Sequence, residues 1–292
     1  MSDADALFAA AADALWRNAL AEARALFRRA GEGGRRDAAV IHANFVAAGT
    51  GAAPDWPRGV ALLRRLAESS PRSRRELAII EAMALTPAGD PVVAPKGEPV
   101  CERPHIVRFA TLFSPAECRY LAEAAAPMLE PSVVVDNATG RQVRDPVRTS
   151  DGIGFTLPLE NPAVHALNRR IAAASGTAVA QGEPLQVLRY RPGDQYRTHF
   201  DAIPGFANQR VMTMLVWLNG DYEGGGTRFP TPDLSLKGEA GDAILFRNAG
   251  ADGRRDPDAA HAGLPVTRGE KLIASRWIRA RPFEMPTAGR AA

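Results

Sequence analysis

The chain has 292 residues, a formal net charge of +3 and 46% hydrophobic residues, which is the composition of an ordinary globular protein with room for two domains. The small charge, and the lack of aromatic residues interleaved with basic ones, argue against a nucleic-acid partner. No apolar run approaches the length of a membrane span, and the first residues lack a signal-peptide charge pattern. Cys101 and Cys118 have no metal-type spacing. We therefore expect a cytoplasmic protein without a membrane partner.

Residues 1–86 are predicted to be helical. Ala, Leu, Arg and Glu dominate there, and apolar residues such as Leu20, Ala23 and Phe27 recur at helical spacing. An internal repeat accompanies them, because residues 25–29 match residues 61–65 at the spacing of one helix-pair repeat.

The stretch 47–56, with residues 59–63 after it, resembles a Sel1-like repeat, a relative of the tetratricopeptide repeat. Stacks of such repeats usually present a surface to a protein partner, although a short stack can instead simply pack on its neighbouring domain. Both interpretations of these helices remain open from the sequence.

A stretch rich in proline and glycine, residues 87–103, is predicted to be an extended linker. Beyond it, Ser114 and Glu117 form a capping-box pattern that opens a helix, and a second helix is predicted over 162–174. Strands are then predicted at four places: 185–191, 211–218, 243–247 and 272–278. Short strands with turn signals between them are typical of a β-sandwich or jelly roll.

Two histidines and one aspartate have the spacing expected of a metal site. His199 and Asp201 would share a face of an extended strand, and His261 would have to arrive from a distant strand. Two imidazoles and one carboxylate are the ligand set of a non-haem Fe(II) oxygenase, whereas a structural zinc site is closed by four protein ligands. The other histidines lack such spacing, and we assign them ordinary packing or surface roles: His42, His105 and His165.

Lys271 follows His261 and supplies the compact cation that a dicarboxylate co-substrate would need. A surface lysine after a Gly-Glu turn is the plainer alternative. The polar loop 247–258, just before His261, is either a mobile lid or a simple connection.

The segment 104–283 resembles the prolyl 4-hydroxylase type of Fe(II)/2-oxoglutarate dioxygenase. The matching pieces appear in the order of that family: 113–118, 135–140, 148–150, 190–201, 209–219, 222–230, 261–266, 269–271 and 276–278. The resemblance implies an α+β fold, with a double-stranded β-helix (jelly-roll) oxygenase domain and flanking helices over 104–283. The small all-α helical-repeat domain over 1–86 precedes it, and residues 284–292 are expected to be a flexible tail.

The resemblance also implies a role for each matching residue. The iron ligands would be His199, Asp201 and His261. The distal carboxylate of 2-oxoglutarate would bind Lys271, Tyr190 and Thr227. The peptide substrate would meet Arg210 and Trp277.

Plainer roles remain open for four of these residues. Tyr190 could be a wall residue, Thr227 a strand start, Arg210 a solvated charge and Trp277 part of the core.

The implied activity consumes O₂ and 2-oxoglutarate at Fe(II), releases succinate and CO₂, and hydroxylates prolyl residues of a peptide or protein. Ascorbate is a candidate additional cofactor, and no catalytic residue beyond the metal site is predicted. Three departures from the family pattern affect the substrate groove rather than the ligands: Asp194 for Gln, Gly226 for Glu and Leu272 for Trp.

Three other functions stay open. One is the same chemistry on a free amino acid or another small molecule. The next is a silent oxygenase fold whose helices bind a partner. The last is a zinc hydrolase, for which the sequence offers no general base.

Overall fold

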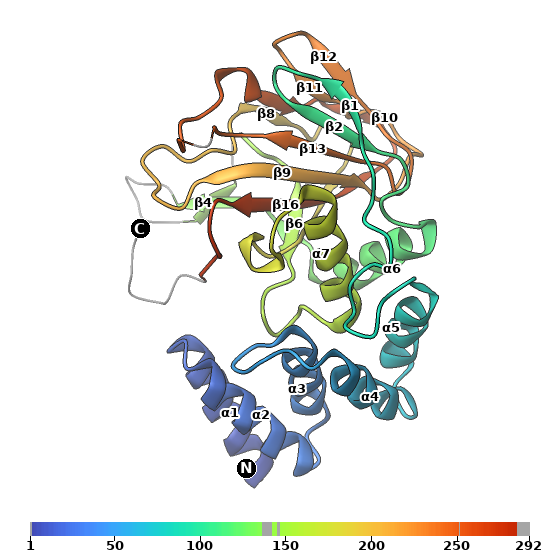
Figure 1. Cartoon of the computed structure of the whole chain (residues 1–292), viewed down its shortest axis with the longest axis vertical. Helices are drawn as coiled ribbons and strands as arrows, with labels where there is room; N and C mark the ends of the chain where they lie inside the picture. The colour runs from blue at the N-terminus through green and yellow to red at the C-terminus, as the bar shows by residue number, and fades with distance from the viewer. Residues whose placement is uncertain (1, 136–141, 145–146, 251, 285–292) are drawn as a thin grey trace. The chain divides into compact units, whose positions relative to one another are not determined.

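The computed structural model describes residues 2–135, 142–144, 147–250 and 252–284, which form two compact units (Figure 1). The helical unit contains the described residues up to 94, the segment Phe155–Arg170 and Glu284. The sheet unit contains the described residues of Pro95–Gly154 and of Ile171–Phe283. The predicted tail, from residue 285 on, and the matching segment 136–140 lie outside the described residues.

Five helices account for most of the helical unit, as predicted for residues 1–86: α1 (Asp3–Trp16), α2 (Leu20–Glu32), α3 (Arg36–Ala48), α4 (Trp56–Ala67) and α5 (Pro71–Ala82). Each packs against the next helix in the chain. Asp55 and Ser70 accept backbone hydrogen bonds at the starts of α4 and α5, each just before a helix with proline in its first turn. Phe27 and Phe45 meet edge-on in the core.

A segment from the middle of the chain completes the helical unit. The Asn44 amide donates a hydrogen bond of 3.1 Å to the carbonyl of Pro158. The rings of Trp56 and His165 lie 6.4 Å apart, and a guanidinium nitrogen of Arg169 donates to the carbonyl of Ala88 at 2.9 Å. Helix α7 (Pro162–Ser175), predicted over 162–174, begins in this unit and ends in the sheet unit.

The sheet unit is built on an eight-stranded antiparallel sheet. Its strands, in spatial order, are β1 (Glu98–Cys101), β2 (Ile106–Phe109), β13 (Ala243–Arg247), β9 (Arg210–Trp217), β16 (Lys271–Arg279), β7 (Gln186–Tyr190), β6 (Asp151–Gly154) and β3 (Glu130–Pro131). Strands β7, β9, β13 and β16 are the four that the sequence predicts, each within a residue at either end.

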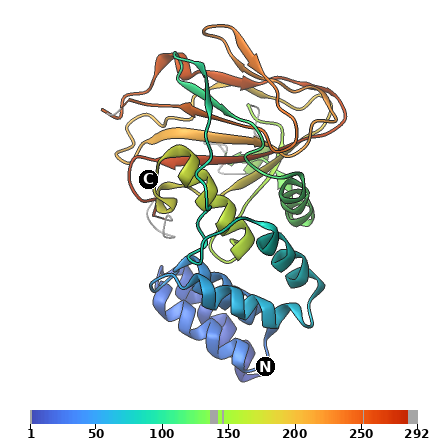
Figure 2. The ribbon, with the colours of Figure 1, turned by 45° about the vertical axis from the view of Figure 1, so that its right-hand side comes forward.

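A four-stranded antiparallel sheet lies against the large one (Figures 1 and 2). Its order is β12 (Leu234–Leu236), β11 (Thr227–Phe229), β14 (His261–Gly263) and β8 (Tyr196–His199). Two short pairs are β10 (Glu223–Gly224) with β15 (Val266–Arg268) and β4 (Val133–Val135) with β5 (Gln142–Arg144). Phe229 of the small sheet meets Phe246 of the large sheet edge-on at 5.2 Å, so the apolar core of this unit lies between the two sheets.

Helix α6 (Pro115–Ala125) packs against β7. The predicted capping box is present, with Ser114 and Glu117 each accepting a backbone hydrogen bond from the other. Cys118 on this helix is buried, and both cysteines are free thiols. Among the described residues, no helix is long and apolar enough to cross a membrane.

Candidate metal centre and co-substrate pocket

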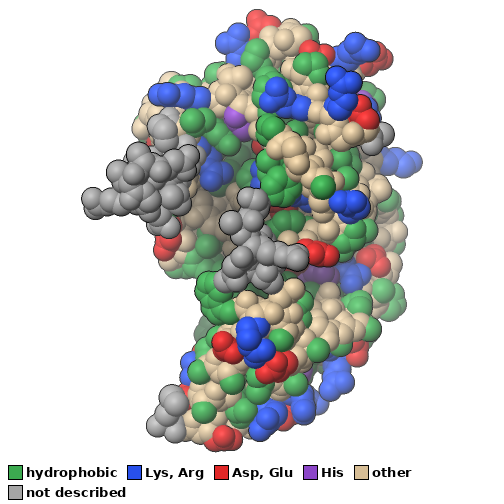
Figure 3. Space-filling view, turned by 90° about the vertical axis from the view of Figure 1, so that its left-hand side faces the viewer, with side chains coloured by type: hydrophobic (Ala, Val, Ile, Leu, Met, Phe, Trp, Pro, Cys, Tyr) green, Lys and Arg blue, Asp and Glu red, His purple; other side chains and the backbone are tan. Residues whose placement is uncertain are grey.

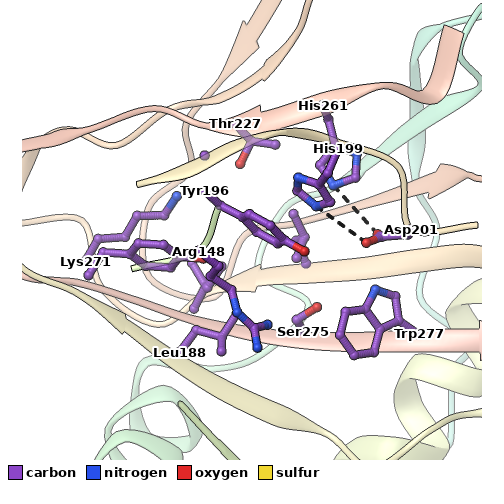
Figure 4. Close-up of a pocket in the computed structure, with 14 residues that line it drawn as sticks. Arg148, Leu188, Tyr196, His199, Asp201, Thr227, His261, Lys271, Ser275 and Trp277 are labelled. Atoms are coloured by element: carbon purple, nitrogen blue, oxygen red, sulfur yellow. Dashed lines mark ion pairs between the residues drawn. The ribbon is translucent and has the colours of Figure 1, made fainter. Parts of the chain in front are cut away.

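Three side chains that could ligate a metal converge at one end of the small sheet (Figure 4). His199 and His261 are paired directly across the antiparallel strands β8 and β14, with ring centroids 4.3 Å apart. Their Nε2 atoms lie 3.6 and 3.7 Å from the carboxylate oxygens of Asp201. Donor atoms of all three residues lie within 4.8 Å of one another, close enough to bind one ion.

Asp201 reaches this cluster in a way that the sequence does not predict. Strand β8 ends at His199, so Asp201 follows the strand instead of alternating within it. The hydroxyl of Thr213 on β9 donates a hydrogen bond of 2.6 Å to Oδ2 of Asp201. The position of the buried carboxylate therefore depends on a contact with the opposite sheet.

Backbone carbonyls orient both imidazoles. Nδ1 of His199 lies 2.8 Å from the carbonyl oxygen of Arg197, and Nδ1 of His261 lies 3.0 Å from that of Ala259. A carbonyl can only accept, so each Nδ1 carries the proton and each Nε2 keeps its lone pair for a ligand.

Electrostatics favour a neutral His261 and an ionised Asp201. Burial lowers the pKa of His261, which favours the neutral ring. Burial alone would raise the pKa of Asp201, but His261, His199 and the Thr213 hydroxyl lower it well below its usual range. Two neutral imidazoles and one ionised carboxylate fit the donor set of an Fe(II) site with open coordination positions.

The cluster opens into a pocket lined by both sheets (Figure 4). Its lining residues are Arg148, Leu188, Tyr190, Tyr196, His199, Asp201, Leu215, Thr227, His261, Gly263, Lys271, Ile273, Ser275 and Trp277. Four of them are alternate residues of β16, as expected when one face of a strand lines a cavity. The sheet unit is hollowed on the face seen in Figure 3, with histidine and cationic side chains visible beside the hollow.

Lys271 is a buried cation in this pocket, with 2% of its surface exposed. Its Nζ donates a hydrogen bond of 2.6 Å to the carbonyl of Gly225, and no acidic group in the described part of the chain acts on it. Burial, with a smaller contribution from Lys237, lowers its pKa to about 8. A buried ammonium without a counterion attracts an anionic ligand, because pairing offsets its lost hydration.

The backbone conformation of Gly225 directs its carbonyl oxygen toward Nζ of Lys271. Gly225 has φ +65°, a left-handed conformation, and a Cβ there would lie 3.0 Å from the Tyr222 ring and 3.2 Å from Cδ of Lys271. Only glycine fits without displacing these neighbours.

Tyr190 and Thr227 are both buried in the pocket wall, one from each sheet. Tyr190 is paired with Lys271 across β7 and β16, and Nζ of Lys271 lies 5.3 Å from its ring centroid. Burial raises the pKa of Tyr190 to about 12, so the phenol keeps its proton and can donate a hydrogen bond. Both side chains line the same pocket as Lys271.

Trp277 lines the pocket, whereas Arg210 does not. The Arg210 guanidinium stacks on the Trp277 ring at 3.6 Å from its centroid. The Glu183 carboxylate accepts two hydrogen bonds from it, at 2.6 and 2.9 Å, and also forms an ion pair with Arg279. Arg210 therefore contacts the Trp277 ring without lining the pocket itself.

Sequence reasoning assigned no role to two prominent lining residues. The Tyr196 ring stacks on His199 with centroids 3.4 Å apart, and the Arg148 guanidinium lies 5.5 Å from the Tyr196 ring centroid. Tyr196 begins strand β8, which ends at His199, so its closeness to a candidate ligand in the sequence could have pointed to it. Arg148 lies far from the ligands in the chain, and only its place in the family-matching stretch 148–150 marks it in the sequence.

None of the remaining histidines belongs to the candidate metal cluster among the residues that the structure describes. His165 is buried and hydrogen-bonds Glu160 at 2.8 Å, and His42 is partly buried on α3. His105 is exposed. In the loop 247–258, Ala249 forms a bridge with Arg255, and the Arg255 guanidinium lies 3.9 Å from the Phe200 ring centroid.

Comparison with known proteins agrees with this site. The profile of the 2OG-Fe(II) oxygenase superfamily matches residues 185–279. Prolyl 4-hydroxylase 1 of Arabidopsis thaliana is 39% identical over 203 residues, which cover 63% of this chain and 72% of that protein. Prolyl 4-hydroxylase 5 of the same plant is 31% identical over 212 residues, covering 64% and 72%.

Among solved structures, the viral collagen prolyl hydroxylase of Paramecium Bursaria Chlorella virus-1, in its 2OG complex, superposes with a TM-score of 0.50. It is 28% identical, and the match covers 62% of this chain and 99% of the viral protein. The chain belongs to the 2OG-Fe(II) oxygenase superfamily and, within it, to the prolyl 4-hydroxylase family.

Proposed function

We propose that the protein is an Fe(II)- and 2-oxoglutarate-dependent dioxygenase that hydroxylates prolyl residues of a peptide or protein. One observation carries this proposal: the His199, Asp201 and His261 cluster opens into the same pocket as the buried cation of Lys271. A metal that needs open positions and a dicarboxylate that needs a buried counter-charge would meet there.

One group of residues would bind the metal, and another would bind the co-substrate. Iron would be held by Nε2 of both histidines and by the Asp201 carboxylate, and it would couple O₂ activation to the conversion of 2-oxoglutarate into succinate and CO₂. Lys271 would pair with the distal carboxylate, and the hydroxyls of Tyr190 and Thr227 would donate to it. The apolar wall, including Leu215, would keep water out and strengthen these contacts.

The peptide substrate would lie at the Trp277 side of the pocket, on the indole that Arg210 and Glu183 hold in place. The prolyl 4-hydroxylases among the relatives support a prolyl substrate. The same chemistry on a free amino acid remains the second candidate. The mass of the hydroxylated product, from a proline-rich peptide or from free proline, separates the two.

Other parts of the proposal concern the whole chain. The two facing sheets support a jelly-roll, double-stranded β-helix oxygenase domain over 104–283. The paired helices of residues 1–86 suit a Sel1- or tetratricopeptide-like stack that offers a surface to a protein partner. Two free thiols suit a reducing cytoplasm, and ascorbate is proposed as an additional reductant.

The first experiment needs no substrate. Fe(II) and 2-oxoglutarate are added to metal-free protein without oxygen, and the visible band of a 2-oxo acid bound to Fe(II) is recorded. We expect the band in the natural protein, its loss in His199→Ala and its weakening in Lys271→Ala. A folded natural protein that gives no band would contradict the proposed function.

A further inference from the structure

A chain of hydrogen bonds runs from the end of β13 to the carboxylate of Asp201. The Asn248 amide donates to the Thr213 hydroxyl oxygen at 2.7 Å, and that hydroxyl donates to Oδ2 of Asp201 at 2.6 Å. Thr213 and Asn248 are 0% and 1% exposed, so water does not compete with these bonds.

Only one direction of proton donation fits this chain. A threonine hydroxyl has a single proton, and its oxygen already accepts from Asn248. The proton is therefore left for the carboxylate, and a hydroxyl that donates to an ionised carboxylate makes a charge-assisted bond.

Thr213 is polar, whereas its neighbours on the same face of β9 are apolar. The alternate residues Leu215 and Trp217 belong to the apolar core between the sheets. A buried hydroxyl in such a row is costly unless it is hydrogen-bonded, so its contact with Asp201 is what offsets the cost.

Asn248 is a rigid donor because its backbone is held on both sides. Its N–H donates to the carbonyl of Val211 at 2.8 Å, and its carbonyl accepts from the N–H of Asp256 at 2.9 Å. Its side-chain Oδ1 forms no hydrogen bond with any residue that the structure describes. If the amide turned over, that oxygen would draw the Thr213 proton away from Asp201.

We propose that Thr213 and Asn248 are positioning residues that hold Oδ2 of Asp201 and so fix the orientation of the carboxylate beside the Nε2 atoms of His199 and His261. This inference rests on the proposed function. Because β8 ends at His199, the strand does not fix the carboxylate, and the hydrogen-bond chain supplies the missing constraint. A carboxylate held in one orientation keeps a fixed place among the ligands, so the positions that a chelating 2-oxo acid and O₂ require would stay open.

The test measures metal affinity instead of turnover. Co(II), a divalent probe stable to air, is titrated into metal-free full-length protein, and thermal unfolding of each metal-free variant is recorded beside it. Thr213→Val keeps the shape but removes the hydroxyl, and we expect its Kd for Co(II) to rise about 10- to 100-fold. Thr213→Ser keeps the hydroxyl and should bind within about threefold of the natural protein.

Asn248→Leu removes the hydrogen bond from Asn248 to Thr213. It replaces Thr213→Val as the test if that variant does not fold. Removing the donor should raise the Kd about fivefold, the effect of one ordinary hydrogen bond. Asn44→Leu, which removes a buried amide in the helical unit, is the matched control and should leave the Kd unchanged.

The outcomes are separable. If the natural protein binds Co(II) but the folded Thr213→Val variant, or Asn248→Leu in its place, binds it equally well, the positioning role is refuted and the proposed function stands. If the natural protein does not bind Co(II), the proposed function itself is refuted.

Discussion

Replacing Lys271 by methionine separates a ligand-binding lysine from a structural one. Methionine keeps the long unbranched stem and removes the charge. Lowering the pKa of Lys271 from 10.5 to about 8 implies, at about 1.4 kcal/mol for each pKa unit, that the protonated side chain costs the folded protein about 3 kcal/mol. Lys271→Met removes this cost, but it also leaves the Gly225 carbonyl without its donor, which costs about 1–3 kcal/mol.

These two effects nearly cancel, so the metal-free variant should keep its free energy of unfolding to within about 2 kcal/mol. Its affinity for 2-oxoglutarate should fall sharply. Removing one partner of a buried charge pair costs about 2–5 kcal/mol, which corresponds to a Kd at least about 30-fold higher.

Two measurements check the argument: urea unfolding of the metal-free protein, and anaerobic titration of the Fe(II) protein with 2-oxoglutarate. Lys237→Met is the matched control, because Lys237 is half-buried, donates to the Tyr222 carbonyl and does not line the pocket. It should change the Kd by less than about threefold. A Lys271→Met variant that binds 2-oxoglutarate like the natural protein would refute the reasoning, as would one that loses most of its stability.

Four further predictions follow from the same contacts. Affinity for 2-oxoglutarate should be constant below pH 8 and fall by up to about tenfold per pH unit above it, because Lys271 loses its proton there; a flat profile from pH 7 to 10 would argue against the lysine. Without ligand, the unfolded chain binds more protons than the folded one between pH 8 and 10.5, so the contribution of Lys271 to the free energy of unfolding should rise across that window in urea titrations. Glu183→Gln leaves two guanidinium groups with a neutral partner and should destabilise the protein by about 3 kcal/mol in urea; a loss under 1 kcal/mol would show that the ion pairs are not structural. Thr227→Val should raise the Kd for 2-oxoglutarate about fivefold by titration, whereas no change would mean that its hydroxyl does not reach the ligand.

Local patterns predicted much of the fold. The Ser114 and Glu117 pair marked the start of α6, because a capping box needs only residues three apart. Strands β9 and β16 were predicted to within a residue at either end, because both carry apolar side chains on both faces. The candidate ligands and Lys271 could be named because their spacing matches a known family.

Long-range contacts could not be predicted in the same way. Nothing near Asp201 in the chain indicates that β8 ends at His199, or that Thr213 and Asn248 hold the carboxylate. The function of a single buried hydroxyl depends on which strands face each other, and periodicity does not encode that. The contact of Arg210 with Glu183 could not be predicted either, because only the fold brings that distant segment of the chain beside β9.

The makeup of the helical unit has a consequence for synthesis on the ribosome. Its five helices are complete early, yet Pro158 and His165, which contact Asn44 and Trp56, are translated only after β1 to β6 of the sheet unit. Domains generally fold as they emerge, N-terminal first. This one stays unfinished until residue 170 has left the exit tunnel, so a nascent or truncated chain that stops before Phe155 exposes apolar helix surface to chaperones and proteases.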